Sequence, residues 1–421
     1  MSAPDPQALD VQALGRRAEA MLAELGAISA EPGRLVRLFL TPEHRRAADL
    51  TAKWMRDAGM SVSEDALGTV RGHFGKSPRR LLIGSHLDTV IDAGRYDGPL
   101  GIVAGILAVE HVARSGRALP FGIDVLAFGD EEGSRFPATL ASSSACAGVF
   151  ERETLPLADA NGVTLADALK AYGKNAAEIP AAAYKPGEVS AYVEVHIEQG
   201  PVLEANGQPL GIVTGIVGQH RVRVTVTGEA GHAGTVPMGL RHDALAGAAE
   251  MALALEAIAR EHPEDGMVGT VGRIEALPGA VNIIPGTVTF TVDLRSLTDD
   301  FRLAALKKFE TACKRIAGAR GLFFSFETFH EIATAHCASA LQDALAKAVT
   351  GLGHTPIRLP SGAGHDAQVM ARLCPSAMLF VRCRGGISHN PAEFASAADM
   401  GLAIAALIRV IEKFDGGLTS P

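Results

Sequence analysis

The first part of the chain alternates between helix-like segments and short β-rich runs. Apolar residues recur at helical spacing over residues 11–25 and 44–60, which predicts two opening helices. Four β-rich runs follow, and a helix-like segment separates the third from the fourth: SVSED, TVRGHF, LLIGSH and GIDVLAF. Strands that alternate with helices are typical of parallel βαβ units. We therefore expect an α/β domain with a mostly parallel central sheet flanked by helices.

The pattern changes after Gly211. Residues 221–228, RVRVTVTG, alternate strictly between polar and apolar, as a strand with one wet face does. Further helix-like and strand-like segments follow in turn, at residues 242–260 (helix), 271–277 and 287–296 (strands), 299–317 (helix) and 322–329 (strand). This β-α-β-β-α-β order predicts a small four-stranded antiparallel sheet with two helices on one face.

From His336 the chain returns to longer helices and one apolar strand, AMLFV. The middle block is therefore expected to be inserted into the larger α/β domain. We expect that domain to occupy residues 1–213 and 331–421, with the inserted α+β domain at 214–330.

Composition narrows the classes of function. The 421 residues are 47% hydrophobic and 20% charged, which suits a chain that buries a sizeable core. A formal charge of −8 argues against nucleic acid or an anionic membrane surface as the main partner. The first ten residues, MSAPDPQALD, lack the features of a signal peptide, and no apolar run approaches the ~18 residues of a membrane span. We expect a cytoplasmic protein.

The five cysteines are odd in number, far apart and without a CxxC pair. This spacing indicates neither a disulfide framework nor a thiolate zinc site. We interpret them as buried or inert thiols, at Cys146, Cys313, Cys337, Cys374 and Cys383.

Polar side chains follow the apolar strands at the point where each strand ends. His86 ends one strand, with Asp88 two residues later on the same side of the chain, where its carboxylate can hydrogen-bond to the histidine ring and orient it while the ring binds a metal. Asp97 precedes a glycine turn, and the next strand ends in Asp130-Glu131-Glu132. Because ligand sites lie beyond the carboxyl ends of strands in open α/β sheets, these acids should meet near one histidine. Like charges so close need cations or protons between them.

Two more segments carry the same kind of ending. AYVEVHIEQG ends at His196 and Glu198, and GGISHNPAEF offers His389 between turn residues. Three histidines with two or three carboxylates make a ligand set suited to zinc, manganese, cobalt or nickel. A carboxylate that bridges two ions would explain the number of acids.

Two other segments resemble known motifs but do not have the spacing that those motifs require. GPLGIVAG is a glycine-rich entry to a helix, but it matches neither GxGxxG nor GxxxxGK[ST]. HEIATAH places its second histidine six residues after the first, so the two cannot share a helix face as in a zincin.

A series of motifs in order resembles one family of dinuclear-metal amidohydrolases. The motifs are GSHLDTV, GRYDGPLG, EEGSRFP, HIEQGP, GHAGTVPM, NIIPG, DLRS, SGAGHDA and ISHNPAEF. The family groups N-carbamoyl-L-amino-acid hydrolases, allantoate amidohydrolases and β-ureidopropionases, a branch of the aminoacylase and carboxypeptidase-like metallopeptidases. The resemblance covers residues 35–411. It implies hydrolysis of a linear ureido C–N bond, with release of ammonia and carbon dioxide.

The resemblance also implies roles for residues of the larger domain. Two divalent ions per subunit would be held by His86, Asp97, Glu132, His196 and His389, with His86 and Glu132 at different ions and Asp97 as the bridge. Glu131 would be the general base and acid for a hydroxide held between the ions, with a third metal ligand as its alternative role. Such assistance suits a ureido carbonyl, which is a poor electrophile.

In the inserted block, His232 resembles the family's oxyanion-stabilising histidine. Gln199, Asn282 and Arg295 resemble residues that hold the substrate's polar groups, and Arg295 suits a bidentate clamp on a carboxylate. Weaker matches near the site are Gln219, His220, Gly362 and His365. Relatives dimerise through this block, so we expect a homodimer in which His232 and Arg295 act in trans. The alternating strand at 221–228 is a candidate edge for the partner to use.

The chain departs from the family pattern twice. EDALGTV has Thr69 where the relatives' Asp-x-x-Gly-Asn turn usually ends in asparagine, and residues 141–148 read ASSSACAG where many relatives read Gly-Ser and a short loop. The second departure leaves the substrate's side chain undecided. An aminoacylase- or dipeptidase-like hydrolase and an inactive binding relative remain as alternatives. The physiological ureido acid and the metal stay open.

Overall fold

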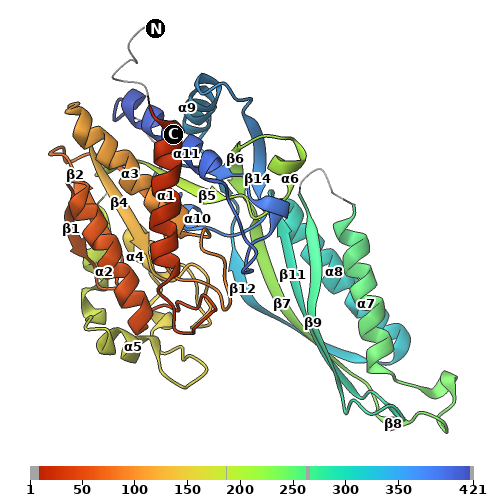
Figure 1. Cartoon of the computed structure of the whole chain (residues 1–421). Coiled ribbons are helices and arrows are strands. Elements are labelled where there is room, and N and C mark those ends of the chain that lie inside the picture. The colour runs from red at the N-terminus through yellow and green to blue at the C-terminus, as the bar shows by residue number, and fades with distance from the viewer. Residues whose placement is uncertain (1–8, 186, 262–265, 418–421) are drawn as a thin grey trace. The chain divides into compact units, whose positions relative to one another are not determined.

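The computed structural model describes residues 9–185, 187–261 and 266–417, which form two compact units (Figure 1). The main unit comprises the described residues up to Thr214 together with those from His336 onward. The inserted unit is the continuous segment Gly215–Ala335 between them.

A nine-stranded sheet forms the centre of the main unit. Eight strands follow the order β1-β2-β4-β3-β5-β15-β6-β13, and β14 pairs with β6 outside this path. The strands are β1 Ser61–Glu64, β2 Val70–Phe74, β3 Arg80–His86, β4 Gly122–Phe128, β5 Val189–Ile197, β6 Leu210–Ile216, β13 Ala335–His336, β14 Ile357–Ser361 and β15 Ser376–Val381.

The four central strands, β4, β3, β5 and β15, are parallel to one another. β2 pairs antiparallel with β4 on one side, and β6 pairs antiparallel with β15 on the other. β3, β4, β5 and β15 are buried almost throughout, as expected for parallel strands covered on both faces. The predicted mostly parallel sheet flanked by helices is confirmed.

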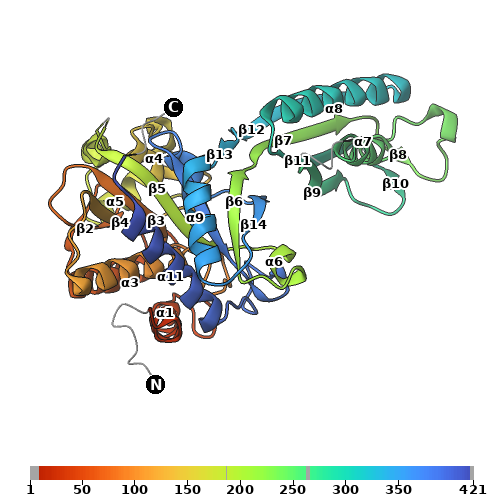
Figure 2. The same ribbon diagram turned by 90° about the horizontal axis from the view of Figure 1, so that it is seen from above.

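Helices cover both faces of this sheet. α3 lies on the face of Ile83 and Val125, which meet Gly105 of that helix, and α1, α3 and α11 lie along the same side (Figure 2). α10 packs on the opposite face, where the Ala367 N–H donates to Glu194 of β5. The helices are α1 Val11–Gly26, α2 Pro42–Asp57, α3 Pro99–Ser115, α4 Ala141–Ala147, α5 Leu165–Ala171, α6 Val202–Ala205, α9 Ser339–Gly351, α10 Asp366–Met370 and α11 Ala397–Lys413.

The inserted unit contains a four-stranded antiparallel sheet and two helices, as predicted. Its strand order is β12-β7-β11-β9, and a short separate ladder joins β8 to β10. The elements are β7 Gly218–Thr227, β8 Gly231–His232, α7 Ala244–Ala259, β9 Val268–Leu277, β10 Ile283–Ile284, β11 Thr287–Ser296, α8 Asp299–Arg320 and β12 Phe323–Ile332.

The expectation that residues 221–228 form an edge strand is wrong. They belong to β7, which pairs with β11 on one side and with β12 on the other. The alternating pattern indicates that one face of the strand is exposed to solvent, but it does not indicate whether the strand lies at the edge or in the middle of the sheet. The edges of this sheet are β9 and β12.

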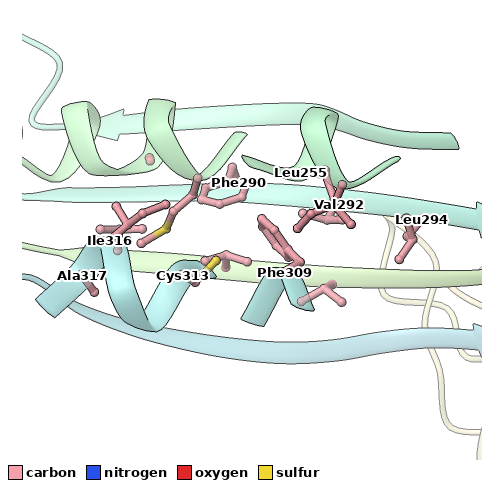
Figure 3. Packing of buried hydrophobic residues seen from close by; sticks show 14 of the residues in the cluster. Leu255, Phe290, Val292, Leu294, Phe309, Cys313, Ile316 and Ala317 are labelled. Atoms are coloured by element: carbon pink, nitrogen blue, oxygen red, sulfur yellow. The ribbon is translucent and has the colours of Figure 1, made fainter. Parts of the chain in front are cut away.

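Alternate residues of β7 and β11 build the core of the inserted unit. Phe290, Val292 and Leu294 of β11 point toward α7 and α8, where Phe309 and Ile316 of α8 meet them (Figure 3). The intervening threonines of β11 are half-exposed. Both helices therefore cover the same face of the sheet, and the other face is open, with threonines and charged residues along β7 and β11 and the exposed Phe323 and Leu277 at its edges.

All five cysteines are buried and free, as interpreted from their spacing. Among the described residues, none of the helices combines the length and the apolar character that crossing a membrane would require.

Candidate metal centre

The carboxyl ends of the parallel strands bring the predicted residues of the main unit together. His86 is the last residue of β3 and pairs with Phe128, the last residue of β4, directly before the segment that holds Glu131 and Glu132. His196 lies near the end of β5 and pairs with Phe380 of β15, the strand that leads toward His389. Neighbouring parallel strands end at one edge, so residues far apart in sequence converge there.

Asp97 reaches this edge because the chain turns sharply into α3. Gly98 has a φ of 80°, and a Cβ atom there would lie 2.5 Å from the His86 ring. Only glycine permits that conformation and that close approach. Gly98 therefore allows α3 to begin beside the histidine, with Asp97 facing inward.

The Asp97 carboxylate lies at the centre of three imidazoles. Its Oδ1 atom is 3.1 Å from Nε2 of His196 and 3.7 Å from Nε2 of His86. Its Oδ2 atom is 3.2 Å from Nε2 of His389. Each oxygen thus faces a different set of histidines, as a bridging carboxylate requires.

Three groups of side chains around Asp97 could each hold an ion. One consists of His86, Asp97 and His196, and a second of Asp97, Glu132 and His389. A third combines His86 with Glu131 and Glu132. Asp97 is common to the first two groups.

The tautomers of two histidines favour a cation in the first group. Nδ1 of His196 lies 2.9 Å from the carbonyl oxygen of Ile197, and Nδ1 of His86 lies 3.2 Å from that of Asp88. A carbonyl only accepts, so each Nδ1 carries the proton and a neutral ring presents the lone pair of Nε2. The buried Nε2 of His196 has no hydrogen-bond partner, although it faces Asp97. A lone pair that faces a carboxylate is a suitable place for a divalent cation.

Asp88 links the two strand ends. Its two oxygens accept the backbone N–H groups of Glu131, at 3.0 Å, and of Glu132, at 3.2 Å. Its Oδ1 atom is also 3.3 Å from Nδ1 of His86. The side chain therefore orients His86 and the glutamate pair together, as a carboxylate behind a metal ligand does.

Burial and neighbouring charges shift the pKa values of the cluster in opposite directions. Burial opposes ionisation of Asp97, but His196 and His389 hold the pKa of its carboxyl well below its usual range. Asp97 raises the pKa of His389 to about 9. Burial and then Asp97 raise the pKa of Glu132 to about 7. Protons and cations thus compete for the same atoms.

Glu131 differs from the residues around Asp97. Burial raises the pKa of its carboxyl well above the usual value, while His86 lowers it and Glu132 raises it. Its nearest imidazole atom, Nε2 of His86, is 4.0 Å away. A carboxyl group with a raised pKa holds a proton more readily than an exposed one, which suits proton transfer.

Comparison with known proteins identifies the family. Residues 82–413 match the model of peptidase family M20/M25/M40. The chain belongs to this family. An N-carbamoyl-L-amino acid amidohydrolase from Geobacillus stearothermophilus is 42% identical over 94% of this chain and 98% of its own length. An allantoate deiminase from Arabidopsis thaliana is 43% identical over 94% of this chain and 81% of its own length. A hydantoinase/carbamoylase family amidase from Burkholderia multivorans has the same fold, with a TM-score of 0.86 and 32% identity over 94% of this chain and 97% of that one.

These relatives place the chain in the hydantoinase/carbamoylase branch of the M20 family. It is a hydrolase of carbon–nitrogen bonds other than peptide bonds, of the carbamoylase and allantoate amidohydrolase type. The M20 family is metal-dependent, and the groups around Asp97 are the candidate metal sites of this member.

Other predicted residues of the main unit lie beside the cluster. The Gln199 side chain donates from Nε2 to Oδ2 of Asp97 at 2.8 Å, and its φ of 57° is unusual for a residue other than glycine. The His365 ring packs edge-on against His196 with centroids 4.4 Å apart, and its Nε2 lies 2.9 Å from the Ser361 hydroxyl. A Cβ atom at Gly362 would meet no other atom within 4 Å.

The inserted unit, which is the M20 lid domain, brings its predicted residues together in two pairs. His232 pairs with Ile283 in the short β8–β10 ladder, and the adjacent Ala233 N–H donates to the Asn282 carbonyl. Nδ1 of His232 accepts the Gly234 N–H at 3.0 Å, so a neutral ring carries its proton on the exposed Nε2. That nitrogen can then donate a hydrogen bond to a ligand.

The second pair joins β7 and β11, where Gln219 lies opposite Arg295. Nε and Nη2 of Arg295 donate to the two oxygens of Asp293, each at 2.9 Å, so the guanidinium plane is fixed. His220, another of the weaker matches, is buried, and its Nδ1 atom lies 2.7 Å from Nη1 of Arg302. It is held inside the lid domain by that contact.

Three residues near the centre, Glu194, Glu393 and Arg37, have notable positions that their sequence patterns did not reveal. Glu194, two residues before His196 on β5, forms another close group with His196 and His365. The available signal for Glu194 was its spacing, because residues two apart on a strand point to the same face and Glu194 therefore lies beside His196. Glu393 accepts from the backbone N–H groups of Tyr96 and Asp97. Arg37, fully buried, donates from Nε to the Leu87 carbonyl at 2.7 Å. Glu198, in contrast, caps α6 through Val202 and Leu203.

The departure at residues 141–148 also has a structural role. It forms α4, and Asp130 accepts from the backbone N–H groups of Ala141 and Ser142, each at 2.9 Å, and from the Ser142 hydroxyl at 2.6 Å. α4 therefore anchors the residue directly before Glu131. At the other departure, Asp65 accepts the N–H groups of Leu67 and Thr69, which closes the turn.

Proposed function

We propose that this M20 hydrolase cleaves the linear ureido C–N bond of an N-carbamoyl-L-amino acid or an allantoate-type substrate. The products would include ammonia and carbon dioxide from the carbamoyl group. The observation that carries the proposal is the Asp97 carboxylate, whose two oxygens face two different sets of metal-binding side chains. Relatives of both substrate types match this chain with 42% and 43% identity, so similarity leaves the choice between them open.

The residues around Asp97 suit two divalent ions. His86 and His196 would hold one ion and Glu132 with His389 the other, while Asp97 bridges them. Manganese, cobalt, nickel and zinc all accept this mixture of imidazole and carboxylate ligands. When bound, such ions polarise the ureido carbonyl and lower the pKa of water, which a poor electrophile needs.

Glu131 would move the proton. It lies beside the ligand groups, and its raised pKa lets its carboxylate take a proton from the attacking water and donate it to the departing nitrogen. Asp88 supports this role because its Oδ1 atom accepts the Glu131 backbone N–H at 3.0 Å, which fixes the backbone of the proposed base. Because Glu131 would keep the proton until the C–N bond breaks, the leaving nitrogen could depart as a neutral amine and not as an anion.

The lid domain would supply the substrate contacts. The Nε2–H of His232 suits an oxyanion, and the guanidinium of Arg295, fixed by Asp293, suits a carboxylate. Asn282, Gln219, Gln199, Gly362 and His365 would surround the remaining polar groups of the substrate. We propose, from the family resemblance, that the protein is a homodimer in which His232 and Arg295 serve the site of the other subunit.

The test is a substrate panel with added manganese. N-carbamoyl-L-amino acids with different side chains, N-carbamoyl-β-alanine and allantoate are compared with N-acetyl amino acids and dipeptides, and product amine and ammonia are measured. The proposal expects ammonia from at least one ureido acid, with a kcat/KM well above that for any acetyl or peptide substrate. Turnover confined to acetyl amino acids or dipeptides would instead establish an aminoacylase or a dipeptidase.

A further inference from the structure

A buried glutamate outside the proposed ligand set fastens together the two loops that meet at Asp97. Glu393 is 5% exposed and lies four residues after His389. Its Oε1 atom accepts the backbone N–H of Tyr96 at 2.9 Å and that of Asp97 at 3.1 Å. The carboxylate therefore ties the loop that follows β15 to the loop between β3 and α3.

The other oxygen of Glu393 reaches the same place through a serine. The Ser388 hydroxyl lies 2.9 Å from Oε2 of Glu393 and 2.8 Å from Oδ2 of Asp97. One hydroxyl proton can serve only one of these oxygens at a time, so Ser388 spans the two carboxylates. Glu393 thus holds Asp97 in two ways: it accepts the Asp97 backbone N–H, and it contacts the Ser388 hydroxyl that also contacts the Asp97 carboxylate.

The packing around Glu393 leaves it little freedom. A Cβ atom at Gly94 would lie 2.2 Å from Cδ of Glu393, so the glutamate rests directly on the backbone of the Asp97 loop. Its own N–H donates to the Asn390 carbonyl at 3.0 Å, which closes the turn that directly follows His389. A shift of the glutamate would move both loops.

We infer that Glu393 is a positioning residue that makes Asp97 a bridge between the two groups of metal-binding side chains. It fixes the carboxylate with Oδ1 toward His196 and Oδ2 toward His389. Within the described residues, the hydrogen bonds of the Glu393 carboxylate go to Tyr96, Asp97 and Ser388 rather than to either histidine, so it acts through Asp97. This inference rests on the proposed pair of ions and adds the residue on which their coupling depends.

The test compares Glu393→Ala and Glu393→Gln with the wild-type protein. Glutamine keeps an oxygen that can accept both backbone N–H groups, whereas alanine removes it. Manganese stoichiometry is measured by elemental analysis, affinity by titration, and coupling between the two ions by electron paramagnetic resonance. We expect the alanine variant to lose about 10- to 100-fold in manganese affinity, together with the signal of coupled ions. The glutamine variant should retain both.

Glu198 provides the matched control. It is 8% exposed, lies two residues after His196, and accepts two backbone N–H groups, from Val202 at 2.7 Å and Leu203 at 3.0 Å. Glu198→Ala should cost stability as Glu393→Ala does, because each leaves two N–H groups without their acceptor. It should leave two coupled ions in place.

A second variant tests the same idea without removing the glutamate. Gly94→Ala places a methyl group against Glu393 and should displace it, with the same loss of coupling. This variant decides the matter if Glu393→Ala fails to fold. Two coupled ions with wild-type affinity in Glu393→Ala or in Gly94→Ala would overturn the inference, as would an equal loss in Glu198→Ala. A wild-type protein that binds only one ion would contradict the proposed centre as well.

Discussion

Oδ1 of Asp88 accepts the backbone N–H of Glu131 at 3.0 Å, across 43 residues of chain. The other oxygen accepts the next N–H along the chain, so one carboxylate fixes the end of β4 to the end of β3. Because that carboxylate also lies beside Nδ1 of His86, it sets the geometry of a proposed ligand and of the proposed base together.

Asp88→Asn is therefore expected to weaken metal binding. An asparagine presents one oxygen and one N–H₂ group, so it can accept only one of the two backbone N–H groups in this geometry. We expect the affinity for manganese to fall about 10- to 100-fold, measured by titration of the chelator-treated protein. Glu198→Gln is the control, since the two oxygens of Glu198 also accept one backbone N–H group each, but at the start of α6. Unchanged affinity in Asp88→Asn would remove Asp88 from the centre.

The two adjacent glutamates should separate metal binding from proton transfer. Glu131→Gln keeps the shape of the side chain but cannot carry a proton, so we expect both ions to stay and kcat to fall by roughly 10²- to 10⁴-fold. Glu132→Gln should instead lose metal, because Glu132 belongs to the group with Asp97 and His389. Metal content and single-turnover rates of the two variants are compared. Loss of about half the metal in Glu131→Gln would exchange the two roles.

A buried histidine under the centre should make folding sensitive to acid. Nδ1 of His44 lies 2.8 Å from the Tyr172 hydroxyl, and burial, then Arg37, lowers the pKa of His44 from 6.5 to about 3. The neutral ring is favoured in the folded state, so its contribution is present above pH 6.5 and is lost as the pH falls toward 3.

Between pH 7 and pH 5 the loss from this one group should be about 2 kcal/mol of unfolding free energy. His44→Gln can still hydrogen-bond to Tyr172 but does not titrate. The free energy of unfolding of both metal-free proteins is measured in urea at the two pH values. The change between the two pH values in wild type, minus the same change in the variant, gives the contribution of His44. An equal pH dependence in wild type and variant would show that His44 does not supply it.

The sequence predicts that the candidate metal-binding side chains meet, because parallel strands end at a common edge. His86, Glu132 and His196 follow or close three buried parallel strands, so their meeting follows from the sheet. Asp97 reaches the same edge through the loop that turns at Gly98. Contacts that depend on loop paths could not be read in this way. Glu393 meets the Asp97 N–H across 296 residues, and no periodic pattern reports that distance.

Strand order is the other limit. The alternation of residues 221–228 fixes which face of β7 is buried, since side chains alternate across a strand. It does not fix the neighbours, and β7 turned out to be paired on both sides. The outer strands β9 and β12 are the ones with a free edge within the sheet.

Subunit mixing tests whether the lid domain acts in trans. Glu131→Ala protein and Arg295→Ala protein should each be inactive, because one lacks the base and the other the carboxylate clamp. If the clamp comes from the other subunit, each mixed dimer has one intact site, and activity should return to a substantial fraction of wild type. Light scattering and tagged subunits verify exchange. A mixture that exchanges and stays inactive would place Arg295 in its own subunit's site.

The most direct test is ammonia release from the best ureido substrate as manganese is returned to chelator-treated protein. We expect no turnover without metal and a rise in rate that saturates at two ions per chain, with elemental analysis at each point. Full turnover at zero bound metal, or saturation at one ion, would contradict a centre built on Asp97 as a bridge.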